Sequence, residues 1–312
     1  PMPIRRAKML LDLVRQMSIT IEPDELIVGN RSLLPRMGVI TPEGAVDWVD
    51  KELDILPTRP QDKFNIRPEY IKELREEIFP YWRGKTLEDT VAARVPDDVM
   101  VAVTGKAFSL NQTDHAQGHI LPDVEGWLHL GIKGLREKLN AARQRSQVQS
   151  AEKQIFYDAA FIALQAAQEF MARYADLARH RLEQTSEQDR VQELTRIADV
   201  CAWLSENPPR DFWEALQAVW FLFVLLQIES NASSFSPGRF DQYMLPFLER
   251  DLESGKLTLS EAQTLLEYLW LKFNEIVLLR SSSSARYFAG FPIGFNLILG
   301  GQLADGNDAT NF

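Results

Sequence analysis

Three side chains of metal-ligand type follow one another at a fixed spacing in the first half of the chain. His115, His119 and Asp123 form the pattern H-x3-H-x3-D, which would place three metal ligands on one face of a helix. A glycine and a proline inside this stretch oppose a regular helix. Two other interpretations remain open. The loop could bond its own backbone, or Asp114 and His119 could project into a substrate cavity.

A run of hydroxyl side chains follows the most apolar segment of the chain. Ser233, Ser234 and Ser236 come directly after it, so an apolar core would carry them inward. A nucleophilic serine needs a nearby base, and no G-x-S-x-G pattern is present. These hydroxyls could instead bind a polar substrate by hydrogen bonds. A solvated turn before Pro237-Gly238 explains them equally well.

Two arginines flank four consecutive serines near the end of the chain. Guanidinium and hydroxyl donors suit a carboxylate or a phosphate, so Arg280 and Arg286 could hold an anion. Alternatively, Arg280 complements the C-terminal dipole of the preceding helix. On these residues alone the second explanation is favoured.

The single cysteine does not resemble a reactive thiol. Cys201 shares a helical face with Ile197, Val200 and Leu204, and no histidine lies close to it in the sequence. Reactive cysteines need a cation or a helix N-terminus that lowers the thiol pKa. We therefore expect Cys201 to be a small buried residue without a disulfide partner, as in a reducing compartment.

Composition excludes several classes of protein. The 312 residues are 45% hydrophobic and 25% charged, which is typical of a globular chain and not of a disordered one. The net charge of 34 Lys+Arg against 44 Asp+Glu is −10, which opposes binding to nucleic acid or to an anionic membrane. The apolar run 218–228 is shorter than the roughly 20 residues of a membrane span. A buried helix and a cytoplasmic protein are expected.

The elements that must position these residues are mostly helices. Apolar periodicity predicts helices over 2–17, 151–182 and 189–204, another long helix capped by Asp211, and a further one that begins at a Thr258/Glu261 capping box. The stripe of the helix 151–182 includes Phe156, Phe170 and Tyr174. Residues 19–28 and 295–299 have strand-like composition, and 104–126 form a long polar connection. Pro42 and Pro68 each indicate a helix start.

Taken together, several of these segments resemble the N-terminal part of glycyl radical enzymes of the pyruvate formate-lyase type. The segments are Asp24–Arg31 (DELIVGNR), Asn111–Asp114 (NQTD), Gly118–Ile120 (GHI) with Asp123, Gln227–Asn231 (QIESN), Gly238–Tyr243 (GRFDQY) and Gly300-Gly301. These segments occur in the family's order and extend over essentially the whole chain. The subgroup is similar to the one labelled pyruvate formate-lyase 2, or formate acetyltransferase.

The resemblance implies a ten-stranded α/β barrel wrapped in helices, of which this chain would be a predominantly α-helical portion. Residues 1–312 would form the N-terminal part of one such domain. Relatives carry a thiyl-forming cysteine and a radical-storing glycine on two finger loops, and neither loop matches this sequence. The missing initiator Met and the abrupt end after Phe312 also suggest a fragment. The implied cofactor is a glycyl radical outside this chain, installed by an activating enzyme that uses S-adenosylmethionine and an iron–sulfur cluster.

The residues carried over from the resemblance would contact the substrate. In diol dehydratases of the family, a His-Ser pair before Gly-Arg-Phe-Asp-Gln binds substrate hydroxyls, and Ser233 and Ser234 hold those positions here. Loss of the histidine argues against glycerol or propanediol as the substrate. The cavity-facing loop adds Asn111, Asp114 and His119. Arg286 and Phe291 precede another lining segment and strengthen the hypothesis of an anion site.

The implied function is radical C–O or C–C cleavage of a small polyol, polyol phosphate or 2-oxo acid, by a segment that is inactive alone. Alternatives are pyruvate formate-lyase proper, a non-catalytic helical module, half of a split enzyme, and the metal site. The implied partners are the small-molecule substrate, the activating enzyme, the rest of the polypeptide and a second copy in a homodimer, with no nucleic acid and no membrane.

Overall fold

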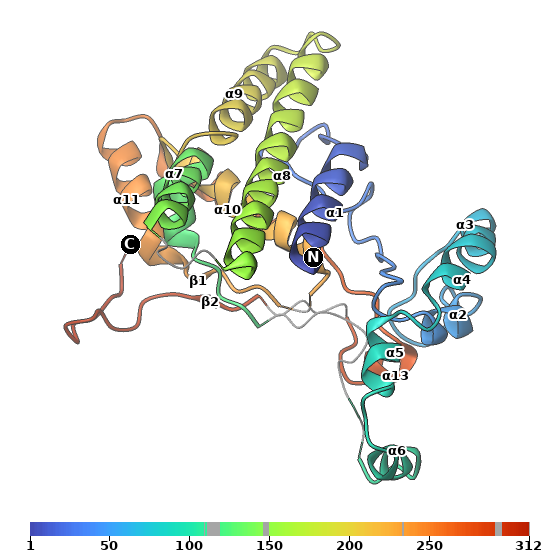
Figure 1. Ribbon diagram of the computed structural model, residues 1–312. Coiled ribbons are helices and arrows are strands. Elements are labelled where there is room, and N and C mark those ends of the chain that lie inside the picture. Colours follow the sequence, from blue (N-terminus) through green and yellow to red (C-terminus); the bar gives the residue numbers. More distant parts are fainter. Residues whose placement is uncertain (109, 111–118, 146–149, 233, 291–294, 312) are drawn as a thin grey trace.

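A computed structural model describes residues 1–108, 110, 119–145, 150–232, 234–290 and 295–311 (Figure 1). The named elements in these ranges are mostly helices, with one pair of short strands. They are α1 (Met2–Gln16), α2 (Asp47–Glu52), α3 (Pro68–Glu73), the π-helix η1 (Leu74–Ile78), α4 (Phe79–Trp82), α5 (Leu87–Ala92), α6 (Asp97–Thr104), α7 (Val124–Arg145), α8 (Ala151–Leu182), α9 (Gln188–Leu204), α10 (Phe212–Ser230), β1 (Gly238–Arg239), α11 (Phe240–Glu253), α12 (Leu259–Glu275), α13 (Ser282–Ala285) and β2 (Leu297–Ile298).

Helix α10 is the centre of the main apolar core. Its residues are buried on all sides, Trp220, Phe221 and Phe223 included, and helices α1, α7, α8, α9, α11 and α12 all contact it. Among the described residues it alone is long and apolar enough to cross a membrane, and 72% of that window is buried inside the protein. Such burial is typical of a core helix that is apolar on every face.

The long helices agree with their sequence signals. Helix α8 begins at an Ser150 N-cap and ends at Leu182, and α12 begins at the predicted capping box of Thr258 and Glu261. Phe156 was expected on the buried stripe of α8, and this prediction is wrong, because its side chain is 62% exposed. The buried core residues of α8 begin at Ala166 and include Phe170 and Tyr174, so Phe156 lies beyond the end of the main core.

The segment 19–28 was expected to be a strand, and in the structure it pairs with no strand among the described residues. Side chains satisfy its backbone instead. Gln217 of α10 accepts a hydrogen bond from the Val28 N–H at 2.8 Å and donates to the Val28 carbonyl at 2.7 Å. The Tyr174 hydroxyl accepts from the Asn30 N–H at 2.8 Å. Trp220 donates to the Gly29 carbonyl at 2.9 Å. We call this arrangement of residues 27–30 on α8 and α10 the backbone clamp.

A smaller apolar cluster gathers α2, η1 and α4 away from the main core (Figure 1). The Pro68 helix start is confirmed by α3, whereas Thr41-Pro42-Glu43 forms a turn and α2 begins only at Asp47. This turn instead binds the N-terminus of α5 through its backbone carbonyls. The carbonyls of Glu43 and Gly44 accept hydrogen bonds from the first N–H groups of α5, at 2.8 and 3.0 Å.

Asp211 fixes the start of α10 and carries a buried charge. Its Oδ1 accepts a hydrogen bond from the Glu214 N–H at 2.9 Å, and its Oδ2 contacts Arg196 and Lys256. Burial alone would raise the pKa of Asp211. The Lys256 hydrogen bond, the Glu214 N–H and the Arg196 charge together bring the pKa below its ordinary value.

We predict that Asp211→Asn lowers the free energy of unfolding by about 2 kcal/mol at pH 7, because the amide keeps the cap and loses both ion pairs. A lowered folded-state pKa stabilises the protein above the ordinary pKa and loses that contribution as pH falls through the folded value. The difference from wild type should therefore shrink below about pH 4 in urea titrations. Asp176→Asn, in an exposed pair with Arg179, is the control. A difference that does not change with pH would contradict this explanation.

Candidate substrate-binding site

Three segments that are distant in sequence meet beneath the helices. Strands β1 and β2 pair in parallel, with Gly238 opposite Leu297 and Arg239 opposite Ile298 (Figure 1). A separate parallel bridge joins Ile120 to Phe235. The backbone of Ile120 donates to the Ser234 carbonyl at 3.4 Å and accepts from the Ser236 N–H at 2.9 Å. The loop before α7 and the loop after α10 are therefore held against each other.

This bridge brings together two of the residues that the sequence analysis assigned to substrate binding. His119 and Ser234 each directly precede one member of the bridged pair Ile120–Phe235, and paired strands lie about 4.8 Å apart. Ser234 is only 4% exposed, whereas His119 is exposed and has no hydrogen-bond partner within the described ranges. We call the two residues the His119–Ser234 pair. An imidazole and a hydroxyl both donate and accept hydrogen bonds, so the pair can bind a substrate hydroxyl.

The backbone at His119 adopts a left-handed conformation with a φ of +59°. This region is uncommon for residues other than glycine, and such conformations cluster at binding and catalytic sites. Here the conformation turns the chain out of the polar connection and into the bridge at Ile120. The observation supports a functional and not merely connecting role for this loop.

The C-cap residue of α10, Asn231, sets the direction of the loop that follows this helix. Asn231 has a φ of +46°, and its N–H donates to the Gln227 carbonyl at 3.0 Å. Its side-chain oxygen accepts from Arg31 at 2.8 Å, and Arg31 also donates to the Val277 carbonyl. Burial lowers the pKa of Arg31 to about 10, so the guanidinium remains charged at neutral pH. The segment that ends the backbone clamp therefore also sets the direction of the Ser234 loop.

A second clamp fixes strand β2 to the start of α11. Asp241 accepts a hydrogen bond from the Gly300 N–H at 2.7 Å, and Arg239 donates to the Gly300 carbonyl at 3.2 Å. Tyr243 donates to the Pro237 carbonyl at 3.0 Å, and burial raises the pKa of this hydroxyl, so it stays a neutral donor. The GRFDQY motif thus acts in part by positioning the strands beside the site.

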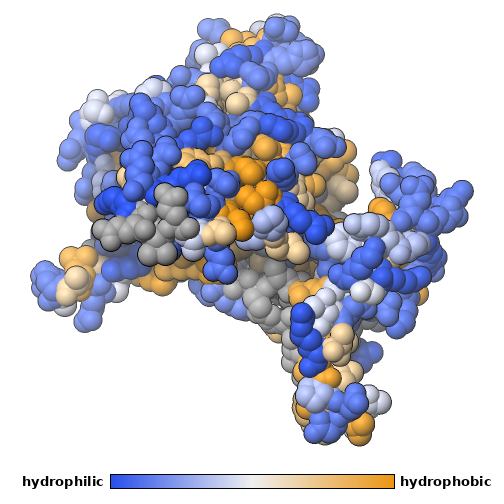
Figure 2. Space-filling model, in the orientation of Figure 1, coloured by the Kyte–Doolittle hydropathy of each residue, from blue (hydrophilic) through white to orange (hydrophobic). Residues whose placement is uncertain are grey.

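Gly238 permits the close approach of the two loops. Its φ is +68°, and a Cβ built there would lie 2.4 Å from Cδ1 of Leu121. Leu121, Ile120, Ile298 and Leu299 are exposed and form an apolar border next to the His119–Ser234 pair. Figure 2 shows a separate group of apolar side chains near the middle of the viewed face, over the region where α8 and α1 lie in Figure 1.

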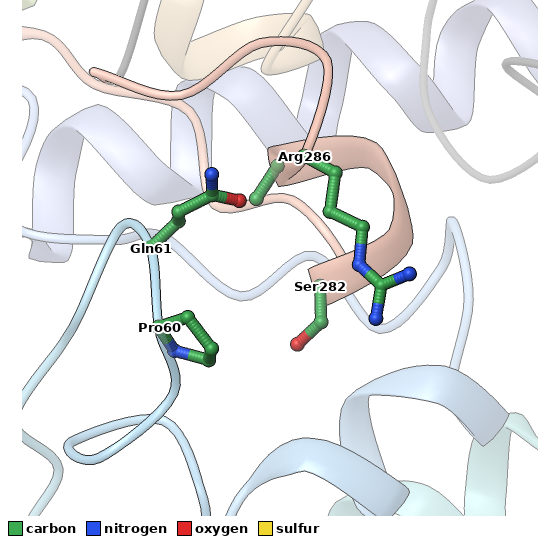
Figure 3. A pocket seen from close by; sticks show the side chains of 5 residues that line it. Pro60, Gln61, Ser282 and Arg286 are labelled. Carbon is green, nitrogen blue, oxygen red and sulfur yellow. The ribbon is translucent and has the colours of Figure 1, made fainter.

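Arg286 lies at a different place, in a pocket of about 200 Å³ lined by Pro60, Gln61, Ser282, Ala285 and Arg286 (Figure 3). It is exposed, and it has no hydrogen-bond or ion-pair partner in the part of the chain that the structure describes. The expectation that Arg280 complements a helix dipole is wrong, because α12 ends at Glu275 and its last-turn cation is Lys272. The Arg280 guanidinium lies over the Phe288 ring at 4.9 Å.

The other candidates have separate outcomes. Asp123 accepts a hydrogen bond from the Gly126 N–H at 2.8 Å and so caps the start of α7. No group of three His, Cys, Asp or Glu residues that could hold a metal occurs within the described ranges. Cys201 is buried in α9, and burial raises the pKa of its thiol, as expected for an unreactive core residue. Asn111, Asp114, His115, Ser233 and Phe291 lie outside the described residues.

Sequence reasoning missed the residues that hold the site in shape. Gly238, Leu121 and Asp241 contribute through a close approach and through backbone contacts. The sequence Pro237-Gly238 could have indicated one of these properties, the positive φ of Gly238. Leu121 lies 117 residues from Gly238, and Gly300 lies 59 residues from Asp241, and neither partner carries a recognisable signal.

Comparisons with known proteins give a consistent result. The family model "PFL-like: Pyruvate formate lyase-like" matches residues 1–312. The Escherichia coli K12 protein named "Probable dehydratase YbiW" is 35% identical over 319 residues, covering 100% of this chain and 39% of the relative. The isethionate sulfite-lyase of Nitratidesulfovibrio vulgaris Hildenborough is 33% identical over 325 residues, with the same two coverages. This chain therefore spans about two fifths of the length of these relatives.

A solved structure agrees with these relatives. The structure reported for 1,2-propanediol dehydration in Roseburia inulinivorans superposes with a TM-score of 0.96 at 35% identity. The match covers 100% of this chain and 39% of that chain. The helical shell described above is accordingly similar to the corresponding part of a glycyl radical enzyme barrel.

We predict that Gly238→Ala destabilises the protein more than Gly255→Ala does, by about 1–3 kcal/mol in urea unfolding. Both glycines have a φ of +68°, but nothing lies within 4 Å of a Cβ at Gly255. The difference therefore isolates the clash with Leu121. The double variant Gly238→Ala/Leu121→Ala should recover most of that difference. Equal effects of the two single variants would show that the loops do not approach as described.

Proposed function

This chain belongs to the pyruvate formate lyase-like family, and on that basis we propose that it forms the substrate-positioning part of a glycyl radical dehydratase or lyase. The observation that carries the proposal is the bridge between Ile120 and Phe235, which holds the segment that contains His119 beside the segment that contains Ser234. The relatives named above include a dehydratase and a sulfite-lyase, which supports elimination from a small hydroxylated substrate.

The His119–Ser234 pair would fix the orientation of a substrate hydroxyl. The buried Ser234 hydroxyl offers one donor and two acceptor positions, and the exposed His119 ring offers one donor and one acceptor when neutral. Correct orientation of a reacting group contributes a large part of the rate enhancement in many enzymes. The Arg31 contact to Asn231 holds the loop after α10, and the bridge between Ile120 and Phe235 holds the loop before α7 against it.

The one cysteine of this chain does not fit the thiyl-forming residue of the family. Cys201 is buried in α9, and burial raises the pKa of its thiol. We place the thiyl-forming cysteine and the radical-storing glycine in sequence outside these 312 residues. The fact that the chain spans 39% of the two curated relatives supports this division. No reaction step is assigned to Cys201.

The proposal includes the partners that this chemistry needs. They are a radical-activating enzyme that uses S-adenosylmethionine and an iron–sulfur cluster, the remaining part of the same polypeptide, and a second copy in a homodimer. A cytoplasmic enzyme of anaerobic metabolism is proposed, and a single cysteine without a disulfide is compatible with it.

Pyruvate formate-lyase proper is the second candidate. It rests on the description of the family, whereas the two relatives named above carry dehydratase and sulfite-lyase names. The exposed border of Ile120, Leu121, Ile298 and Leu299 beside the site supports an enzyme part covered by further protein more than an independent helical module.

The test is anaerobic activation of the full-length protein, followed by a screen of diols, polyol phosphates, hydroxysulfonates, and pyruvate with coenzyme A. The proposal predicts turnover of at least one hydroxylated substrate by elimination. Turnover of pyruvate with coenzyme A alone would favour the second candidate. No turnover of any substrate by a protein that carries a spectroscopically verified radical would contradict the proposal.

We predict that Ser234→Ala lowers kcat/KM about 10- to 100-fold on the substrate found, because one hydrogen bond to the reacting hydroxyl is lost. The protein should remain folded, since a small side chain replaces a small one. Ser260→Ala, an exposed serine in the first turn of α12, is the matched control and should retain the wild-type rate. A wild-type rate in Ser234→Ala would remove this residue from the site.

A further inference from the structure

The helix α6 projects from the rest of the protein (Figure 1). None of its residues is buried, and within the described ranges it takes part in none of the larger packing contacts between the named elements. Its sequence is nevertheless apolar from Val99 to Val103, and Val101 is 71% exposed. Phe108 and Leu110 follow the helix and are exposed as well. We call α6 together with Phe108 and Leu110 the α6 arm.

An isolated helix of this kind is not stable in water. It has eight residues, whereas helices shorter than about 12 residues are marginal even with the best helix formers. Val99, Val101 and Val103 lower its helix propensity further, because their side chains are branched at Cβ. Most helical stability in proteins comes from the packing of an apolar face. The α6 arm therefore requires a surface to pack on, and the described part of the chain does not supply one.

A second surface without a partner lies on the same side of the protein. In Figure 1, α6, β1 and β2 lie in the lower part of the view, and α9 lies at the opposite end. The apolar border beside β2 is exposed. Strands β1 and β2 form a parallel pair of two residues each, and parallel pairs occur almost only where protein covers both faces of the sheet. The strand pair and the α6 arm thus both need to be covered from this side.

The remaining part of the same polypeptide is the occupant that fits both surfaces. The chain spans 39% of the length of its Escherichia coli relative, and the superposition on the Roseburia inulinivorans structure covers 100% of this chain, α6 included. Further parallel strands reach such a pair through crossover connections of one chain. We propose that the α6 arm and the apolar border together form one docking surface for the remaining part of the same polypeptide.

Docking on this surface would enclose the His119–Ser234 pair. In the sequence, the exposed apolar residues of the α6 arm precede His119, and those of the apolar border follow it directly. A body that packs on both would exclude water from the exposed imidazole, and exclusion of water strengthens the electrostatic interactions inside a site. The inference rests on the proposed function, and it adds that the α6 arm helps to close the site.

Hydrogen exchange of the full-length protein tests the docking without turnover, so the docking can fail while the enzyme remains active. The amides of α6 should exchange about 100-fold more slowly than those of an unstructured peptide, because a packed helix opens rarely. Val101→Asp should accelerate this exchange about 10-fold by opposing the packing. Leu13→Asp, which places the same charge on an exposed leucine of α1, is the control and should leave it unchanged. Exchange of wild-type α6 at the rate of an unstructured peptide would overturn the inference.

Photocrosslinking identifies the occupant. The variant Val101→benzoylphenylalanine of the full-length protein is irradiated, separated on a denaturing gel and digested for mass spectrometry. A product with the mass of one chain, crosslinked to a peptide outside residues 1–312, supports the inference. A product of twice that mass would assign the α6 arm to a second copy and overturn the inference, as would no crosslink or one within residues 1–312 alone. The same photoreactive residue at Leu13 is the control and should not reach that peptide.

Discussion

The architecture depends on how the backbone of residues 27–30 is satisfied inside an apolar core. A segment of extended chain normally pairs with a strand, because a buried N–H or carbonyl without a partner costs about 1–3 kcal/mol. Here Gln217 and Trp220 of α10 and Tyr174 of α8 act as that partner. Gly29 is required at the contact, since a Cβ there would lie 2.8 Å from the Trp220 ring nitrogen. Gln217, a buried polar residue of the mostly apolar α10, therefore serves to bind this strand-like segment.

The clamp leads directly to the site. Arg31 follows it in sequence and binds both the Asn231 cap of α10 and the chain after α12, so one side chain sets the course of two loops. A buried ion triplet of Lys272 with Glu25 and Glu275 ties the start of the same segment to α12, with both N–O distances at 2.6 Å. The segment Asp24–Arg31 (DELIVGNR) thus has a structural role: its residues hold helices and loops in place by hydrogen bonds and ion pairs. The residues with an exposed or unsatisfied chemistry, His119 and Arg286, lie elsewhere.

The sequence was sufficient for the long helices and insufficient for the contacts between them. The bounds of α8 and α12 follow from local caps and a 3.6-residue period, which depend on neighbours in sequence alone. The segment 19–28 was assigned to a strand because of its β-rich composition. Composition alone does not distinguish pairing with a strand from pairing with side chains of α10. Phe156 fits the stripe of α8, but where the core ends along a helix is a tertiary property. His119 and Ser234 were both proposed as site residues, yet only the bridge at Ile120 and Phe235 places them together.

The central claim is that His119 and Ser234 act on the same substrate group, and a double-mutant cycle tests it most directly. The kcat/KM values of the wild type, His119→Asn, Ser234→Ala and the double variant of the activated full-length protein give the coupling energy. Residues that bind one hydroxyl together should show coupling of at least about 1 kcal/mol, with the double variant far less impaired than the sum of the single ones. Additive losses within about 0.3 kcal/mol would show that the two side chains act independently and would contradict the account.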